Sequence, residues 1–230
     1  MKRLGRIWPD LISFENFLNA YFKARKGKQS VPSVAEFSLN LEGELLSLQQ
    51  ELSDFTYQPG RYRLFTIYER KKCQIAAAPF RDRVVHHAIL NIIEPAIDRR
   101  FIFDSYACRQ AKGVHAAVNR YQHWSKRYPY VLKMDVEQYF PSIDRDLLKG
   151  KLRYILKDKY VLALLDRIIE TAPAATGRKD ACYFPGDDLL TLLERPTGLP
   201  IGNLTSQFFA NLYLDSLDHF IKEQLHVRAY

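Results

Sequence analysis

The fold is indicated most strongly by residues 131–144, which read VLKMDVEQYFPSID. The apolar run over residues 130–136 predicts a buried strand, with Asp135 near its end. A carboxylate buried at the end of a strand is costly unless it is paired or binds a cation. Two interpretations of Asp135 are therefore open at this point: a cap for the following turn, or a ligand for a metal ion.

A second informative stretch is a glycine-bearing loop, residues 198–207 (GLPIGNLTSQ), which runs directly into a predicted long helix over residues 205–225. Glycine lets the backbone approach a ligand closely, and a helix N-terminus presents N–H donors. The plain alternative is a loop in which Thr205 or Ser206 caps the helix.

The remaining elements follow from the spacing of apolar residues. Helical spacing predicts further helices over residues 14–22, 41–52, 84–97, 144–156 and 161–171, the third bent or ended near Pro95. A hairpin is predicted between residues 62–68 and 73–77, and a long loop or hairpin over residues 173–197. Strands and helices are mixed without regular alternation, which favours the α+β class over a doubly wound sheet.

Composition and charge restrict the class of protein. The chain has 230 residues, of which 34 are Lys or Arg and 26 are Asp or Glu, a formal net charge of +8. No apolar run approaches the roughly 18–20 residues of a membrane span, and we predict no signal peptide. Three scattered cysteines (Cys73, Cys108, Cys182) form neither a disulfide framework nor a CxxC pair, so we expect a cytoplasmic location.

The positive charge is concentrated in two regions. Residues 1–30 hold seven Lys or Arg and two acids, and residues 99–128 hold seven and one. In the second region the cations alternate with aromatic residues such as Tyr106, Tyr121 and Trp124. Cations beside aromatic rings suit a nucleic acid, which combines phosphates with stackable bases. Solubility alone is the alternative explanation of the charge.

Four segments together resemble the catalytic domain of reverse transcriptases. Residues 134–143 are similar to the first catalytic motif of the palm, and the Gly202-x-x-x-Ser206 segment to the motif that follows it. Residues 78–88 and 105–118 resemble finger motifs of the bacterial enzymes. The resemblance implies a right-hand polymerase fold with the thumb absent: an N-terminal helical extension (1–54), fingers (55–128) and a partial palm (129–230).

A finer resemblance is carried by Ile201 and Gln207, which stand where most of the family has Gln and Pro. Together with residues 80–83 and 184–188, this variant is similar to the reverse transcriptases of diversity-generating retroelements. Those enzymes copy a template RNA with frequent errors at adenines. Intron, retron and antiviral-defence reverse transcriptases are the alternatives within the family.

The family's third motif, Tyr-x-Asp-Asp, is absent from the chain. Asp187 and Asp188 precede the glycine loop and are interpreted as an exposed turn. We therefore expect the parent protein to continue past Tyr230 into that motif, and this piece alone to be inactive. If it does not continue, a non-catalytic RNA-binding protein is the alternative.

The resemblance also implies the chemistry, an RNA-directed DNA polymerase that uses two Mg²⁺ ions roughly 3.5–4 Å apart. It assigns Asp135 to both metals and the carbonyl of Val136 to one. Phe140 would exclude a ribose 2′-hydroxyl. With Phe140, five residues would contact the nucleotide (Lys71, Lys72, Phe140, Ile201 and Gly202), and four the nucleic acid (Arg109, Lys112, Ser206 and Gln207).

Several roles are left open. Arg109 and Lys112 have structural bracing as their alternative, and Arg81 and Arg83 could either reach phosphate or brace the fingers. His86, His87 and His115 are interpreted as structural because no Cys/His metal pattern surrounds them. The implied partners are a template RNA, a DNA or RNA primer, deoxynucleoside triphosphates and an accessory basic protein of the retroelement, without a membrane.

Overall fold

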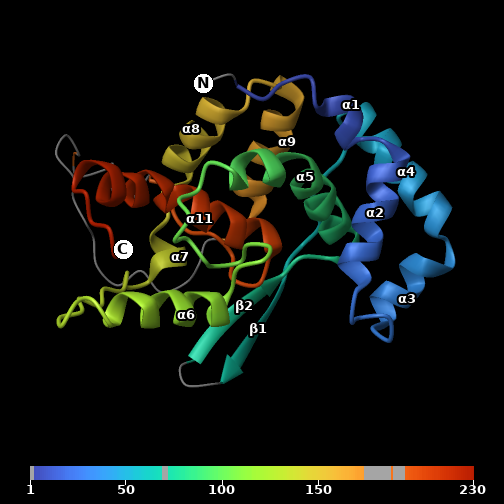
Figure 1. Cartoon of the computed structure of the whole chain (residues 1–230). Coiled ribbons are helices and arrows are strands. Elements are labelled where there is room, and N and C mark those ends of the chain that lie inside the picture. Colours follow the sequence, from blue (N-terminus) through green and yellow to red (C-terminus); the bar gives the residue numbers. More distant parts are fainter. Residues whose placement is uncertain (1–2, 69–71, 174–187, 189–194) are drawn as a thin grey trace.

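The structure is a computed structural model that describes residues 3–68, 72–173, 188 and 195–230. Helix α5 (Phe80–Asp98) lies between an N-terminal group of helices and a C-terminal group, and a two-stranded hairpin extends from one side (Figure 1). Buried residues of α5 and of both helical groups form one continuous hydrophobic core. No helix among the described residues is long and apolar enough to cross a bilayer.

The N-terminal group comprises α1 (Trp8–Leu11), α2 (Phe14–Arg25), α3 (Pro32–Leu39) and α4 (Leu41–Ser53). Helix α2 begins where the sequence predicts, because the Ser13 side chain accepts a hydrogen bond from the Asn16 N–H and caps the helix. The predicted helix over residues 41–52 is likewise confirmed by α4. Helix α2 packs on α5, which continues through Pro95 to Asp98 instead of ending there.

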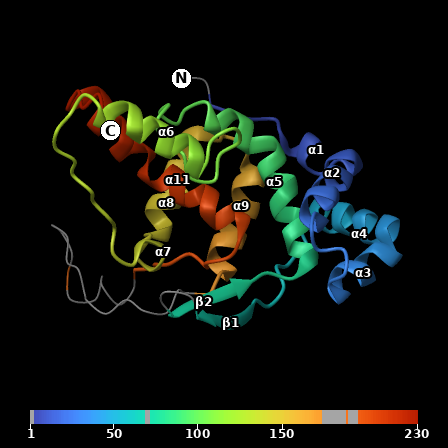
Figure 2. The ribbon, with the colours of Figure 1, turned by 60° about the horizontal axis from the view of Figure 1, so that its bottom comes forward.

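The hairpin consists of β1 (Arg63–Tyr68) and β2 (Lys72–Ala77). The strands are antiparallel, with Ile67 opposite Cys73, which confirms the predicted pairing. Residues 69–71 at its tip, including Lys71, lie outside the described residues. Figure 2 shows the hairpin below α5, at the edge of the helical body.

The second half contains α6 (Val114–Ser125), α7 (Tyr139–Ser142), α8 (Arg145–Ile155), α9 (Lys159–Thr171) and α11 (Leu204–His219), which a π-helix η1 (Phe220–Gln224) extends. Helices α8, α9 and α11 confirm the three helices predicted there. Asp144 caps α8 by accepting hydrogen bonds from the N–H groups of Asp146 and Leu147. Most of the predicted loop over residues 173–197 lies outside the described residues.

The predicted buried strand over residues 130–136 is wrong. This segment has no regular structure, and Tyr130, Leu132 and Met134 are 91%, 80% and 69% exposed. A strand needs a hydrogen-bonded neighbour, and among the described residues the strands β1 and β2 pair only with each other. An apolar run can therefore favour a strand but cannot supply the partner that would pair with it and cover it.

Candidate active site

Asp135 lies on the exposed segment that precedes α7. Gln138, in the left-handed region at φ +50°, turns the chain from this segment into the helix. The carboxylate is therefore open to solvent, and Val136 beside it is half exposed. Carboxylate and carbonyl oxygens are the ligands that Mg²⁺ prefers. Within the described residues, however, no group of three His, Cys, Asp or Glu side chains could hold a metal.

The predicted loop of residues 198–207 is a loop only up to Asn203, since α11 begins at Leu204, and this loop lies along the edge of β2. The Ala76 N–H donates to the Ile201 carbonyl with an N···O distance of 2.9 Å. Gly202 adopts φ +110°, and a Cβ atom there would lie 2.7 Å from Cγ2 of Ile75. Only glycine combines that conformation with such a close approach, so the contact explains why this position needs glycine. It brings Ile201 and Gly202 beside the strand that starts at Lys72, whose side chain the structure does not describe.

The opposite end of the loop is held by Arg145, a residue that the sequence reasoning missed. Its buried guanidinium donates to the carbonyls of Gly198 (2.8 Å), Ala172 (2.9 Å) and Glu170 (3.3 Å). Burial lowers the pKa of Arg145. No sequence pattern reveals this role, because the three acceptors lie 25 to 53 positions away along the chain.

Phe140 is placed beside the same loop. Its carbonyl accepts a hydrogen bond from the Leu199 N–H (2.9 Å), and its half-buried ring packs on the core. The neighbouring Tyr139 donates from Oη to the Ala210 carbonyl of α11 (2.6 Å), and burial raises the Tyr139 pKa. The short helix α7 is therefore tied both to the loop and to α11.

The structure favours the bracing alternative for Arg109. Its side chain is 9% exposed and makes five hydrogen bonds, to the Asp98 carboxylate and to the carbonyls of Asp98, Ile102 and Ser105. A guanidinium has five N–H donors, so none is left for a phosphate. Lys112 makes fewer hydrogen bonds than Arg109 among the described residues. Its ammonium donates to the Phe103 carbonyl and lies 3.6 Å from the centre of the Phe103 ring.

The other basic and polar candidates separate in a similar way. Arg81 forms an ion pair with Glu51 (2.7 Å), which favours bracing, whereas the Arg83 side chain donates from Nε to the Ala78 carbonyl (2.9 Å). Ser206 is buried and is not available for the predicted contact with nucleic acid, because its helix position faces the core. Gln207, the next residue, is exposed.

Two of the histidines that the sequence analysis interprets as structural, His86 and His87, lie on α5. His86 is fully buried and His87 half-buried on α5, and desolvation lowers the pKa of each imidazole to about 4. Positive neighbours act in the same direction, and they include Arg83 for His86, and Lys23 and Lys28 for His87. Neither histidine is part of a metal-binding group among the described residues.

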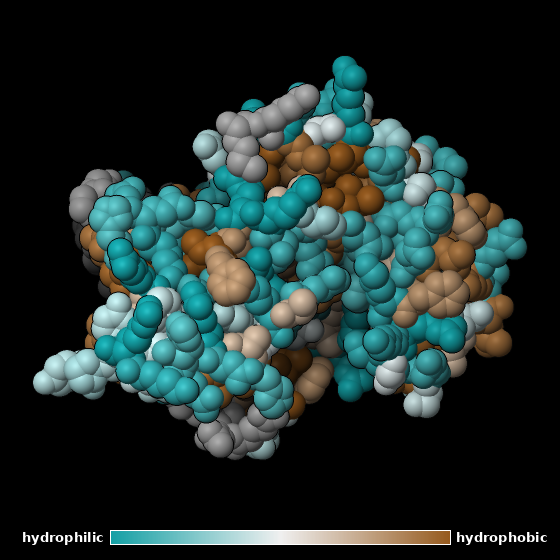
Figure 3. Space-filling view, in the orientation of Figure 1, coloured by the Kyte–Doolittle hydropathy of each residue, from teal (hydrophilic) through white to brown (hydrophobic). Residues whose placement is uncertain are grey.

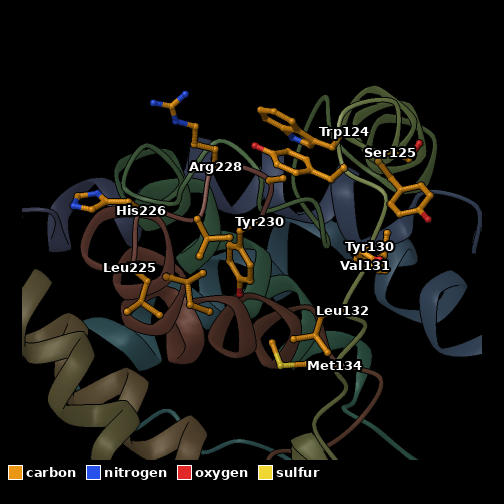
Figure 4. A pocket seen from close by; sticks show the side chains of 15 residues that line it. Trp124, Ser125, Tyr130, Val131, Leu132, Met134, Leu225, His226, Arg228 and Tyr230 are labelled. Carbon is orange, nitrogen blue, oxygen red and sulfur yellow. The ribbon is translucent and has the colours of Figure 1, made fainter.

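An apolar cavity of about 790 Å³ adjoins the segment that carries Asp135. Trp124 of α6, Tyr130 and Leu132 of the segment, and Leu225 and Tyr230 of the C-terminal residues are among the side chains that line it (Figure 4). The face in Figure 3 is mostly hydrophilic, with one hydrophobic patch near the top and another at the right. The sequence reasoning did not anticipate this cavity, because the segment was expected to be buried.

The chain is similar to known proteins over parts of their length, although no protein-family model matches it. "Nuclear intron maturase 1, mitochondrial" of Arabidopsis thaliana is 31% identical over 87 residues, which are 38% of this chain and 12% of the maturase. The "Group II intron-encoded protein LtrA" of Lactococcus lactis subsp. cremoris is 24% identical over 183 residues, 78% of this chain and 28% of LtrA.

The fold is similar to that of a solved structure. A chain of the "Partial Cas6-RT-Cas1--Cas2 complex" superposes on 94% of this chain with a TM-score of 0.57 and 20% identity, and the match covers 35% of that chain. This likeness supports a reverse-transcriptase-like arrangement of fingers and palm. The chain spans about a third or less of the length of each of these three proteins.

Proposed function

We propose that this chain is the fingers and part of the palm of an RNA-directed DNA polymerase. The observation that carries the proposal is that the four motif-bearing segments meet around the start of α11. The loop before α11 forms hydrogen bonds with Ala78 and Phe140. Asn211, two turns into α11, donates a hydrogen bond to the Ala107 carbonyl (2.6 Å). Segments distant in sequence thus converge in one place, and the sequence similarity to intron-encoded proteins supports the same proposal.

Asp135 and Val136 would hold Mg²⁺ through one carboxylate and one carbonyl group. When bound, the metal pair would activate the primer 3′-oxygen and stabilise the leaving pyrophosphate. Asp135 contributes an exposed negative charge at the start of α7, and Phe140 contributes a ring fixed beside the loop. One carboxylate is too little charge for two divalent cations, so further acidic ligands have to come from outside the described residues.

We infer that these ligands come from a strand that pairs with residues 130–136 in a longer protein. Tyr130, Leu132 and Met134 alternate in sequence and are exposed, and no backbone hydrogen bond of this segment is found among the described residues. An unpaired segment with this alternation is suited to accept a neighbouring strand. A Tyr-x-Asp-Asp motif on that strand would bring its carboxylates close to Asp135.

The test is Asp135→Asn in the longest natural form of the protein, assayed by extension of a DNA primer on an RNA template. The substitution removes the charge and nearly preserves the shape, so we expect extension to fall to background while the fold is kept. Glu137→Gln is the matched control, because Glu137 is an exposed acid two residues away. Extension by Asp135→Asn at a rate close to that of the control would contradict the assigned role.

The subtype is a finer proposal. The intron-encoded relatives favour an intron-type enzyme, whereas Ile201 and Gln207 favour the diversity-generating type. If Ile201 removes a polar contact that senses mispairing, Ile201→Gln lowers misincorporation by about two- to tenfold, the value of one hydrogen bond. Sequencing of complementary DNA copied from one defined RNA measures this. Equal error spectra from two active enzymes would place the source of low fidelity elsewhere.

A non-catalytic RNA-binding protein is the second candidate. It is favoured by the lone Asp135, which has no further acidic metal ligands around it among the described residues. The two candidates differ in one observation, namely whether the natural gene continues past Tyr230 into a Tyr-x-Asp-Asp motif. A stop codon directly after Tyr230 selects the binding function.

A further inference from the structure

Asn203 makes an unusual use of its side chain. It occupies the N-cap position of α11, where asparagine is favoured because its side-chain oxygen accepts a hydrogen bond from the first turn of the helix. Here no such capping bond is made. The amide reaches across to the end of β2 instead: Oδ1 accepts from the Ala78 N–H (3.3 Å), and Nδ2 donates to the Ala76 carbonyl (3.0 Å).

This pair of bonds matches the geometry of a strand edge. Residues 76 and 78 are two positions apart, so their backbone groups point to the same side of the chain. Only the observed orientation of the Asn203 amide is compatible with both partners, since the reverse would place two donors and two acceptors face to face. With the bond from Ala76 N–H to Ile201, three hydrogen bonds join the loop to the end of β2.

The contact is buried, and this determines its strength. Asn203 is 3% exposed, and Ala76 and Ala78 are buried with it. Water cannot replace a lost partner at such a site, so removal of the amide would leave a backbone N–H and a carbonyl unsatisfied. Gly202, which has no Cβ to separate the loop from Ile75, allows the approach on which these bonds depend.

We propose that Asn203 is a positioning residue that fixes the β1–β2 hairpin against the loop of residues 198–207. The loop is anchored at its other end by Arg145, so Asn203 sets where the hairpin stands relative to the body of the protein. Figure 1 shows the hairpin beside the start of α11. The effect of this position on a nucleotide bound between the hairpin and the loop rests on the proposed polymerase function.

The first test measures amide hydrogen exchange of Ala76 and Ala78 by NMR in the 230-residue chain, relative to core amides of α5. In Asn203→Ala we expect the relative exchange of Ala78 to rise about ten- to a hundredfold, the effect of one lost buried hydrogen bond. Leu212→Ala is the control, because it truncates a buried side chain of the same helix that makes no bond to β2. A general loss of stability raises the exchange of all amides together, so the control should leave the ratio unchanged.

Asn203→Asp is the second variant and differs from the wild type by one group. The carboxylate still accepts from the Ala78 N–H but has no donor for the Ala76 carbonyl. Loss of that bond loosens the loop at residue 76, where the Ala76 N–H donates to the Ile201 carbonyl, whereas the Ala78 N–H keeps its acceptor. We therefore expect the relative exchange of the Ala76 N–H to rise more than that of the Ala78 N–H. If Asn203→Ala does not fold, the exchange ratios of Asn203→Asp alone test the positioning role. The positioning role would be overturned if the exchange of Ala76 and Ala78 relative to α5 stayed as in the wild type in the Asn203 variants. It would also be overturned if Leu212→Ala raised these ratios equally.

The second test uses the longest natural form of the protein in primer extension. If the hairpin position sets nucleotide affinity, Asn203→Asp raises KM for the deoxynucleotide by about tenfold, with kcat changed less. An unchanged KM together with altered exchange overturns the link to the nucleotide. If the wild-type protein has no polymerase activity, the proposed function is overturned, and the exchange ratios still support or overturn the positioning role independently.

Discussion

Single basic residues that look alike in the sequence have different tasks in the structure. Arg109 and Lys112 are three positions apart, and both were assigned to nucleic acid. Arg109 is enclosed by acceptors from its own chain, whereas Lys112 keeps an exposed ammonium group over two aromatic rings, Phe103 and Tyr106. A guanidinium that is saturated by internal acceptors stabilises the fold and adds little to binding.

Arg109→Ala should therefore lower stability. The substitution removes the five hydrogen bonds that Arg109 makes to the Asp98 carboxylate and to three carbonyls, and we expect the free energy of unfolding to fall by about 2–3 kcal/mol. Urea denaturation followed by circular dichroism measures this. A change within about 0.5 kcal/mol of wild type would show that the hydrogen bonds of Arg109 contribute nothing net.

Lys112→Ala should act on binding instead. We expect stability close to wild type, and a slope of log K against log salt for single-stranded RNA that is smaller by about 1, one released counterion. A salt titration by fluorescence anisotropy gives the slope. The comparison variant is Arg109→Ala, measured under conditions in which it is still folded, for which the slope should be unchanged; a smaller slope in that variant alone would reverse the two assignments.

At the scale of elements, the segment of residues 130–136 is where sequence pattern and structure disagree. Its alternation is that of a strand, but the two described strands pair only with each other. The helices that the sequence predicts, in contrast, all form, because a helix satisfies its own backbone groups and a strand cannot.

Amide exchange over residues 130–136 tests this description. In the 230-residue chain we expect rates near those of an unstructured peptide, because the backbone groups of this segment have no partners among the described residues. In a longer protein that supplies a neighbouring strand, alternate amides should become protected. The helix α8 provides the internal reference in both proteins. Protection of the segment in the short chain would show that it is already paired.

At the scale of the whole molecule, the buried histidines of α5 make stability depend on pH. His86 and His87 have pKa values lowered to about 4 by burial, against an ordinary value of 6.5. The folded protein keeps the imidazoles neutral, while the unfolded chain binds protons below pH 6.5. Stability is therefore complete above pH 6.5 and is lost as the pH falls towards 4.

His86→Leu should flatten this dependence. Nε2 of His86 is buried without a hydrogen-bond partner in the part of the chain that the structure describes, so an apolar side chain is tolerated at pH 7. Between pH 7 and pH 5 we expect the variant to lose about 2 kcal/mol less than the wild type, from the lowered pKa of one fully buried histidine. The control is His115→Leu, at an exposed position. Parallel pH profiles for all three proteins would contradict the role of His86.

Local features of the fold could be predicted from the sequence alone. Ser13 starts a helix and the apolar residues after it continue the helix, because the contacts involved lie within one or two turns. The hairpin of β1 and β2 and the long helix after Gly202 also follow from local pattern and turn chemistry. The motif around Asp135 indicated which residues to consider for chemistry, but that role remains a proposal.

Other features were determined only by the tertiary structure, because they depend on groups far away in sequence. The sequence suggests Thr205 or Ser206 as the cap of α11, but gives no sign that the Asn203 amide bonds to the end of β2, some 125 residues earlier. Arg145 donates to three carbonyls from distant segments, and the N–H groups of Arg109 are all used in hydrogen bonds within the chain. Residues 130–136 stay exposed because no described strand pairs with them. A pattern specifies what a segment can form, while burial and hydrogen bonds are completed only by the partners that the folded chain brings to it.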